Sequence, residues 1–119
     1  MATVSAAALT PELALSYLGE LSTDIKASVV ASADGRKVAA SRPGEQGDRL
    51  RDLTQQLFER ADAADNQAVT QVEVSTGEGA VYAVRDERWT IATVTGRFAL
   101  SSLMFYDLRR VLGDLEGRT

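Results

Sequence analysis

The sequence predicts one α+β domain, an α/β/α sandwich in which three helices cover a five-stranded antiparallel sheet. Three observations lead to this fold class. Apolar residues recur with a helical period in three segments and with strand-like spacing in five others. The segments follow one another as helix, two strands, helix, three strands, helix, without the strict alternation of parallel sheets. Segments 28–31 and 80–84 carry small or apolar side chains on both faces, so helices are expected on both sides of the sheet.

Length and composition indicate a single domain. The chain has 119 residues, of which 45% are apolar and 25% are charged. We expect the domain to span residues 10–115, after a flexible tail of residues 1–9. The tail lacks the basic lead-in of a signal peptide, and no stretch reaches the roughly 20 apolar residues of a membrane span. The sequence therefore predicts a cytoplasmic protein without membrane insertion, and its preference for arginine over lysine is typical of GC-rich bacterial genomes.

The residue types exclude several function classes. The chain has no cysteine and no histidine, which removes thiol catalysis, imidazole acid–base catalysis and metal sites built from these residues. Its net charge of −4 has the wrong sign for a domain that binds phosphate backbones. We therefore expect no enzyme activity, no cofactor, no metal and no nucleic-acid partner.

The first helix is expected from Pro11 to about Leu21. Thr10 can cap the free amides at its start, and proline suits the first helical position. The residues expected on the buried arc of this helix are Leu13, Ala14, Tyr17, Leu18 and Leu21.

A β-hairpin is expected next. Residues 25–33 alternate in polarity, and Asp34-Gly35 suits a two-residue type I′ turn, in which both residues need positive φ. Residues 37–41 are then expected to return antiparallel to the first strand. A Pro/Gly-containing connection, residues 41–47, follows this hairpin.

The second helix is expected to begin near Asp48, where a carboxylate suits a helix start. Its apolar stripe is expected to be Leu50, Leu53, Leu57 and Ala61. Phe58 lies to one side of this stripe, and two interpretations stay open for it: the core of its own chain, or contact with the second helix of a dimer mate.

Three strands and a last helix complete the domain. The strands are expected at residues 69–76, 80–85 and 88–95, joined by turns at residues 77–79 and 86–87. The helix is expected at residues 97–112. Its apolar residues cover about half of its circumference: Phe98, Leu100, Leu103, Met104, Phe105, Leu108, Val111 and Leu112.

The third strand, residues 69–76, has the pattern of a sheet edge. Thr70, Val72 and Val74 alternate with polar residues, and the segment contains no proline or lysine to prevent pairing with another chain. We therefore expect a homodimer with a continuous sheet. Pairing centred on Glu73 would oppose two like charges, so the two-fold axis is expected beside Glu73.

The first hairpin and the closing segment together resemble a known family. Residues 27–41 are ASVVASADGRKVAAS, an apolar strand, an Asp-Gly turn and a strand that ends in Ala-Ser. Residues 79–112 add a glycine-containing hairpin, an apolar strand and a final apolar helix. In this order the chain resembles the Roadblock family of dynein light chains and their bacterial relatives, which have a profilin-like fold.

The resemblance implies a non-catalytic homodimer that binds a small Ras-like GTPase as a regulator or scaffold. It also implies that two protomers pair through their third strands and second helices. Carried to this chain, these are residues 50–62 and 69–75. The expected interface residues are Leu50, Leu53, Thr54, Leu57, Phe58, Ala61, Val69, Gln71, Val72, Glu73 and Ser75.

The candidates for chemistry each have a simpler structural interpretation, which we favour. Gly77-Glu78-Gly79 joins two strands and lacks the helix that a phosphate loop needs. Asp62, Asp65 and Asn66 lack the spacing of a calcium loop and are expected to end a helix. Asp48 and Asp52 lie one turn apart, and Asp48 is better explained as a helix cap than as a metal ligand.

Two further groups leave alternatives open. Asp107 falls inside the apolar arc of the last helix, either as a buried carboxylate with a raised pKa or, as we favour, at the margin and paired with Arg110 or Arg36. Trp89 and Tyr82 form either a binding surface or part of the core. A small-molecule sensor is the alternative function, because alanine-rich strands leave room for a cavity under a helix.

Overall fold

The computed structural model describes residues 9–22, 24–34, 36–42, 44–65 and 68–115. It has the predicted α+β architecture and the predicted order of elements, built on one five-stranded antiparallel sheet with strand order β2-β1-β5-β4-β3. Residues 1–8 of the expected tail, and Gly35 of the expected type I′ turn, lie outside the described residues. The elements are α1 (Pro11–Leu21), β1 (Ile25–Ser32), β2 (Lys37–Ala40), α2 (Glu45–Asp65), β3 (Gln71–Ser75), β4 (Gly79–Arg85), β5 (Trp89–Gly96) and α3 (Ser101–Asp114).

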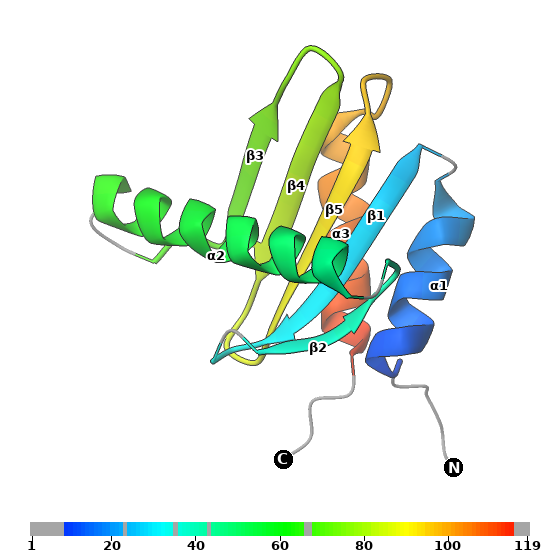
Figure 1. Cartoon of the computed structure of the whole chain (residues 1–119), viewed down its shortest axis with the longest axis horizontal. Coiled ribbons are helices and arrows are strands. Elements are labelled where there is room, and N and C mark those ends of the chain that lie inside the picture. Colours follow the sequence, from blue (N-terminus) through cyan, green and yellow to red (C-terminus); the bar gives the residue numbers. More distant parts are fainter. Residues whose placement is uncertain (1–8, 23, 35, 43, 66–67, 116–119) are drawn as a thin grey trace.

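The sheet has a hydrophobic core on each face, as the two-sided apolar strands predict. Figure 1 shows α2 lying across one face of the sheet and α3 behind the other. The larger core joins α1 and α3 to the sheet around Val30, Ile91 and Leu108, which are completely buried. The smaller core lies under α2, around Val29, Phe58 and other residues. Among the described helices, none is long and apolar enough to cross a membrane.

The first helix begins as predicted but buries a different face. The Thr10 hydroxyl accepts a hydrogen bond from the Leu13 amide at 3.2 Å, so the predicted cap is present. Leu15 is buried, whereas Leu13 and Leu21 are 56% and 40% exposed, and their expected burial was wrong. At the start of this helix the backbone N–H of Leu9 donates to the Asp114 carbonyl at 2.7 Å, which ties residue 9 to the end of α3.

The two other helices also depart from the expected boundaries. α2 begins at Glu45, before Asp48, because Gly44 adopts φ 77° and turns the chain into the helix one turn earlier. Its buried stripe is Leu50, Thr54 and Phe58, where Leu50, Leu53, Leu57 and Ala61 had been expected. α3 begins at Ser101, after the expected start at residue 97.

The β3–β4 turn contains a glycine that the fold requires. A Cβ built on Gly79 would lie 2.0 Å from the Thr95 carbonyl oxygen on β5, and both atoms belong to paired strands that cannot move apart independently. Gly77 in the same turn has open space around it. We expect Gly79→Ala to reduce the free energy of unfolding by about 2–3 kcal/mol, as overpacking does, and Gly77→Ala to change it by less than about 0.5 kcal/mol. Urea unfolding of both variants tests this; equal stability of the two would contradict the close approach.

Candidate interaction surface

The strand β3 lies at an edge of the sheet, as its sequence pattern predicts, and only β4 pairs with it among the described strands. The Arg85 N–H donates to the Thr70 carbonyl, and the Thr76 N–H donates to the Gly79 carbonyl. In an antiparallel ladder, hydrogen-bonded residue pairs alternate with pairs that are not hydrogen-bonded. The even-numbered residues of β3 therefore form its backbone hydrogen bonds to β4. Gln71, Glu73 and Ser75 therefore direct their backbone N–H and C=O groups to the open edge.

An apolar surface adjoins this edge on the α2 side of the sheet. Figure 1 shows that α2 crosses the strands and leaves the half of the sheet next to the β3–β4 turn uncovered on this face. Val74 is 38% exposed there, and Val81 and Val94 are half-buried. Beside them lies the flank of α2 that carries Leu53, 41% exposed, and the half-buried Leu57.

The residues expected in a dimer interface divide into two groups. Leu50, Thr54 and Phe58 are at most 6% exposed and pack under α2 against their own sheet. Their place within the protomer assigns Phe58 to the core of its own chain. The others are exposed or half-buried on the surface of α2 or along β3 and the residue that leads into it: Leu53, Leu57, Ala61, Val69, Gln71, Val72, Glu73 and Ser75. The interface itself stays a prediction.

The C-terminal end of α2 is locked to the start of β3 by Arg85. Its guanidinium contacts both carboxylate oxygens of Asp62, at 2.6 and 2.7 Å, and its Nε donates to the Val69 carbonyl at 2.7 Å. The same guanidinium stacks over the Phe58 ring, 4.2 Å from its centroid. Asp62 completes the lock by accepting the Val69 N–H at 2.8 Å. These contacts therefore fix the position of α2 relative to the edge strand. The sequence analysis did not single out Arg85 because its partner Asp62 lies 23 residues away in the chain.

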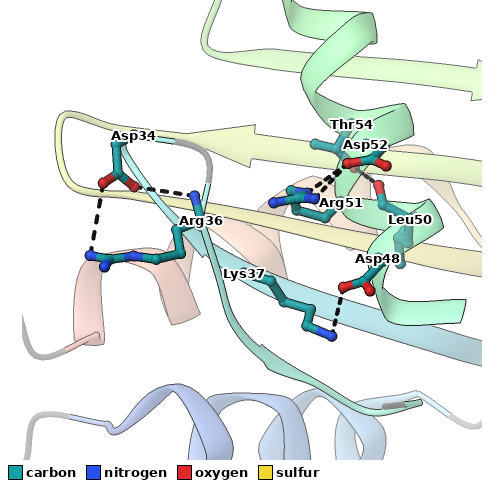
Figure 2. A network of polar contacts seen from close by, with 8 residues as sticks. All are labelled: Asp34, Arg36, Lys37, Asp48, Leu50, Arg51, Asp52 and Thr54. Atoms are coloured by element: carbon teal, nitrogen blue, oxygen red, sulfur yellow. Dashed lines mark hydrogen bonds and ion pairs between the residues drawn. The ribbon is translucent and has the colours of Figure 1, made fainter. Parts of the chain in front are cut away.

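A second ion pair holds the N-terminal end of α2. Figure 2 shows Lys37 reaching from β2 to Asp48 in the first turns of the helix, with 2.8 Å between Nζ and Oδ1. This hydrogen bond lowers the pKa of the Asp48 carboxyl. The same view shows Thr54 donating to the Leu50 carbonyl at 2.7 Å, which satisfies a hydroxyl on the buried stripe. Asp48 thus holds the start of the helix against β2 through its ion pair with Lys37. Among the described residues, no group of three or more acidic side chains could hold a metal ion.

Acid should weaken the lock at Asp62. Hydrogen bonds from Arg85 and from the Val69 amide hold the pKa of this carboxyl below its ordinary value of 3.8. A lowered folded-state pKa gives stability that is present above the unfolded pKa and is lost as pH falls through the folded pKa. We expect Asp62→Asn to be less stable than the parent at pH 7, with the difference shrinking below about pH 4. Thermal unfolding from pH 7 to pH 2 measures it; a constant difference would contradict a charged Asp62 in the lock.

The other sequence candidates occupy structural positions. Tyr82 is 2% exposed and packs edge-on against Phe105, with ring centroids 5.4 Å apart, and Trp89 is half-buried beside the same core. The core interpretation of both aromatics is confirmed. Gly77 lies in the β3–β4 turn, as expected. Asp107 is half-buried on α3, while Arg36 pairs with Asp34 at 3.8 Å instead.

Glu73, the residue that raised a like-charge difficulty, turns its carboxylate toward its own α3. The Ser101 hydroxyl donates to Glu73 Oε2 at 2.8 Å. On the same side of the sheet, Arg109 of α3 donates to the Gln71 side-chain oxygen through Nε at 3.0 Å. The polar side chains of β3 are therefore engaged on the α3 side, and its valines lie on the open α2 side.

Comparison with known proteins identifies the fold. The sequence matches no family model and no curated protein. The structure is similar to a Roadblock/LC7 domain from Streptomyces avermitilis, with 19% sequence identity over 82% of this chain and 88% of that one and a TM-score of 0.74. It is also similar to the gliding protein MglB from Thermus thermophilus (13% identity, 94% and 95% of the chains, TM-score 0.70) and to MglB from Myxococcus xanthus (10%, 80% and 85%, 0.64).

These similarities define a class of protein by its fold. The chain has the Roadblock/LC7 fold, with the three helices and five antiparallel strands of that class in the predicted order. The resemblance drawn from residues 27–41 and 79–112 is confirmed at the level of the fold.

Proposed function

We propose that this protein is a non-catalytic homodimeric module that binds a small Ras-like GTPase in the cytoplasm, as a regulator or scaffold. One observation carries the dimer: among the described strands β3 pairs only with β4, and its open backbone edge lies next to Val74, which is 38% exposed, and the half-buried Val81. An edge with neither proline nor lysine is suited to strand pairing with a second copy. The apolar flank of α2 and the uncovered valines would then be buried between the two protomers.

The alternation along β3 restricts where the two-fold axis can pass. Only Gln71, Glu73 and Ser75 direct donors and acceptors outward, so they must form the hydrogen-bonded pairs between chains. Centring the axis on Val72 sets each Glu73 opposite a Gln71 and avoids a pair of opposed carboxylates. This register agrees with the expectation that the axis lies beside Glu73.

The GTPase partner rests on the resemblance to the Roadblock family and on the fold shared with MglB. A further similar structure is described as MglB with tetrameric arrangement, at 13% identity and a TM-score of 0.69. Assembly from Roadblock-type domains is therefore a property of that relative. With α2 held in place beside a sheet that continues through both protomers, the dimer would present a rigid surface to the loops of a partner.

The solution mass of the purified protein tests the proposal. We expect light scattering to give twice the chain mass of 12.8 kDa. Mixed with small GTPases from the same genome, the dimer should take up GTPase in one nucleotide state, GDP or a GTP analogue, and not in the other. A monomer that ignores every GTPase would contradict both parts of the proposal, and a dimer that ignores them would leave the strand pairing intact and contradict the partner.

One observation favours the alternative function, a small-molecule sensor. A cleft of about 360 Å³ lies between α2 and the sheet, with Val29, Ala31 and Phe58 among its apolar lining and Arg51 and Arg85 among its charged lining. Its size suits a small metabolite. A thermal-shift screen of charged metabolites tests it: a ligand that raises Tm in the parent but not in Arg51→Met would support the sensor.

A further inference from the structure

The β3 edge carries a negative charge on the side of the sheet that faces α3. Gln71, Glu73 and Ser75 turn their side chains to this side, and Glu73 alone of the three is charged. Its Oε2 accepts hydrogen bonds from the hydroxyls of Ser101 at 2.8 Å and Ser75 at 3.3 Å. Within the described part of the chain, the exposed Glu73 forms no ion pair and its Oε1 accepts no hydrogen bond. One carboxylate oxygen is therefore open to a donor from outside the protomer.

The same side carries a positive charge that comes from α3. Ser101 and Phe105 contact β3 and β4, and Arg109 follows them at the same helical spacing. Arg109 is exposed, donates to the Gln71 side-chain oxygen through Nε and Nη2, and forms no ion pair with any described residue. The other charged residues of α3 lie about 140° or more around the helix from Phe105: Asp107, Arg110 and Asp114. Of the charged side chains of α3, Arg109 is therefore the one turned to the β3 edge.

The strand pairing proposed above brings these two charges together between protomers. A two-fold axis through Val72 sets Gln71 opposite Glu73 of the partner subunit. Directly opposed residues of an antiparallel pair have Cβ atoms about 4.5–5.5 Å apart and turn their side chains to the same face. Because Arg109 lies against the Gln71 side chain, its guanidinium is within reach of the partner's Glu73. The symmetry produces the contact twice.

Arg109 also distinguishes between the two registers that keep the two Glu73 carboxylates apart. An axis through Val74 would set the partner's Glu73 opposite Ser75. That position is four residues from Gln71, or about 13 Å along the strand, and therefore away from Arg109. The axis through Val72 joins opposite charges, whereas the axis through Val74 leaves both of them without a counterion.

We propose that Arg109 of each protomer forms an ion pair with Glu73 of the partner subunit, and that the two pairs set the register of the β3 pairing. The inference rests on the proposed dimer. Exposed ion pairs add little affinity, because water and salt screen them. Opposed like charges are costly at an interface, so the two pairs act mainly by excluding other registers and other chains. The surface that they define fits a second copy of this chain.

Charge reversal tests the ion pairs. A homodimer of Glu73→Arg opposes arginine to arginine at both contacts, and a homodimer of Arg109→Glu opposes glutamate to glutamate. We expect each dissociation constant to rise about tenfold or more above that of the parent, measured by light scattering over a dilution series. In a mixed dimer of the two variants, every arginine again faces a glutamate. We therefore expect the mixed dimer to predominate over both homodimers in native mass spectrometry.

Two variants with the same changes of charge serve as controls. Glu20→Arg lies on α1, which contacts β1 and β2 at the other end of the sheet, and Arg110→Glu lies on the side of α3 turned away from β3. Each should dimerise like the parent, and their mixture should contain only the share of mixed dimer that random pairing gives. Recovery of a dimer from Glu73→Arg and Arg109→Glu would also show that both variants fold.

The outcomes separate this inference from the proposed function. A dimeric parent whose dissociation constant neither reversal changes, or a mixture without an excess of mixed dimer, would overturn the ion pairs and leave the dimer in place. A monomeric parent would overturn the proposed dimer and this inference with it.

Neutral substitutions replace the reversals if either of those variants fails to fold. Glu73→Gln and Arg109→Gln each remove the same contact, so the double variant should dimerise no more weakly than either single variant. Additive losses in this cycle would overturn the ion pair between the protomers.

Discussion

Glu73→Pro is expected to convert the proposed dimer into a folded monomer. The Glu73 N–H faces the open edge of β3, so proline there removes a donor from the interchain ladder while the β3–β4 pairing survives. The two-fold axis places the substitution on both sides of the interface. We therefore expect the free energy of dimerisation to weaken by about 3 kcal/mol or more, which raises the dimer dissociation constant roughly 100-fold. Light scattering over a dilution series measures this constant directly.

The matched control is Glu73→Thr. It removes the same carboxylate, and with it the hydrogen bond from Ser101, but keeps the backbone N–H. We expect this variant to remain dimeric. Val72→Pro is a poorer test, because the Val72 N–H belongs to the β3–β4 pairing and its loss damages the protomer itself. A Glu73→Pro protein that stays dimeric would show that the chains do not pair through β3.

Phe58→Ala is expected to have the largest effect on folding. Phe58 is 3% exposed, forms the centre of the core under α2, and lies beneath the Arg85 guanidinium at 4.2 Å. Truncating a buried phenylalanine to alanine leaves a cavity and typically costs about 3–5 kcal/mol. Urea denaturation should show this loss of unfolding free energy, with a fall in Tm of about 10 °C or more.

Leu53→Ala provides the comparison, since Leu53 lies on the same helix but is 41% exposed. We expect it to change the stability of the protomer by less than about 1 kcal/mol and to weaken the dimer instead. The opposite result, a stable Phe58→Ala and an unstable Leu53→Ala, would mean that α2 buries the stripe expected from its sequence rather than the one observed. The two variants together therefore test which face of α2 packs on its own sheet and which face lies in the dimer interface.

The helix faces were the least predictable part of the fold. In α2 both Leu53 and Phe58 lie near the apolar stripe, and periodicity alone does not show which of them the sheet covers. The packing of α2 on the sheet decides it: Phe58 lies in one core with Val29, whereas Leu53 is 41% exposed. In α1 the apolar period places Leu13 on the expected buried face, whereas contact with β1 and β2 buries Leu15.

The sequence by itself determined the order of elements, the cap at Thr10, the exposed edge at β3 and the coverage of both sheet faces. These features depend on neighbouring residues in the chain, through backbone preferences and period-two alternation. The tertiary structure alone decided which donors of β3 face outward, that Arg85 connects α2 to this edge, and that α2 buries Phe58 and exposes Leu53. Each of these depends on contacts between residues far apart in the chain, and such contacts are set by how the layers pack.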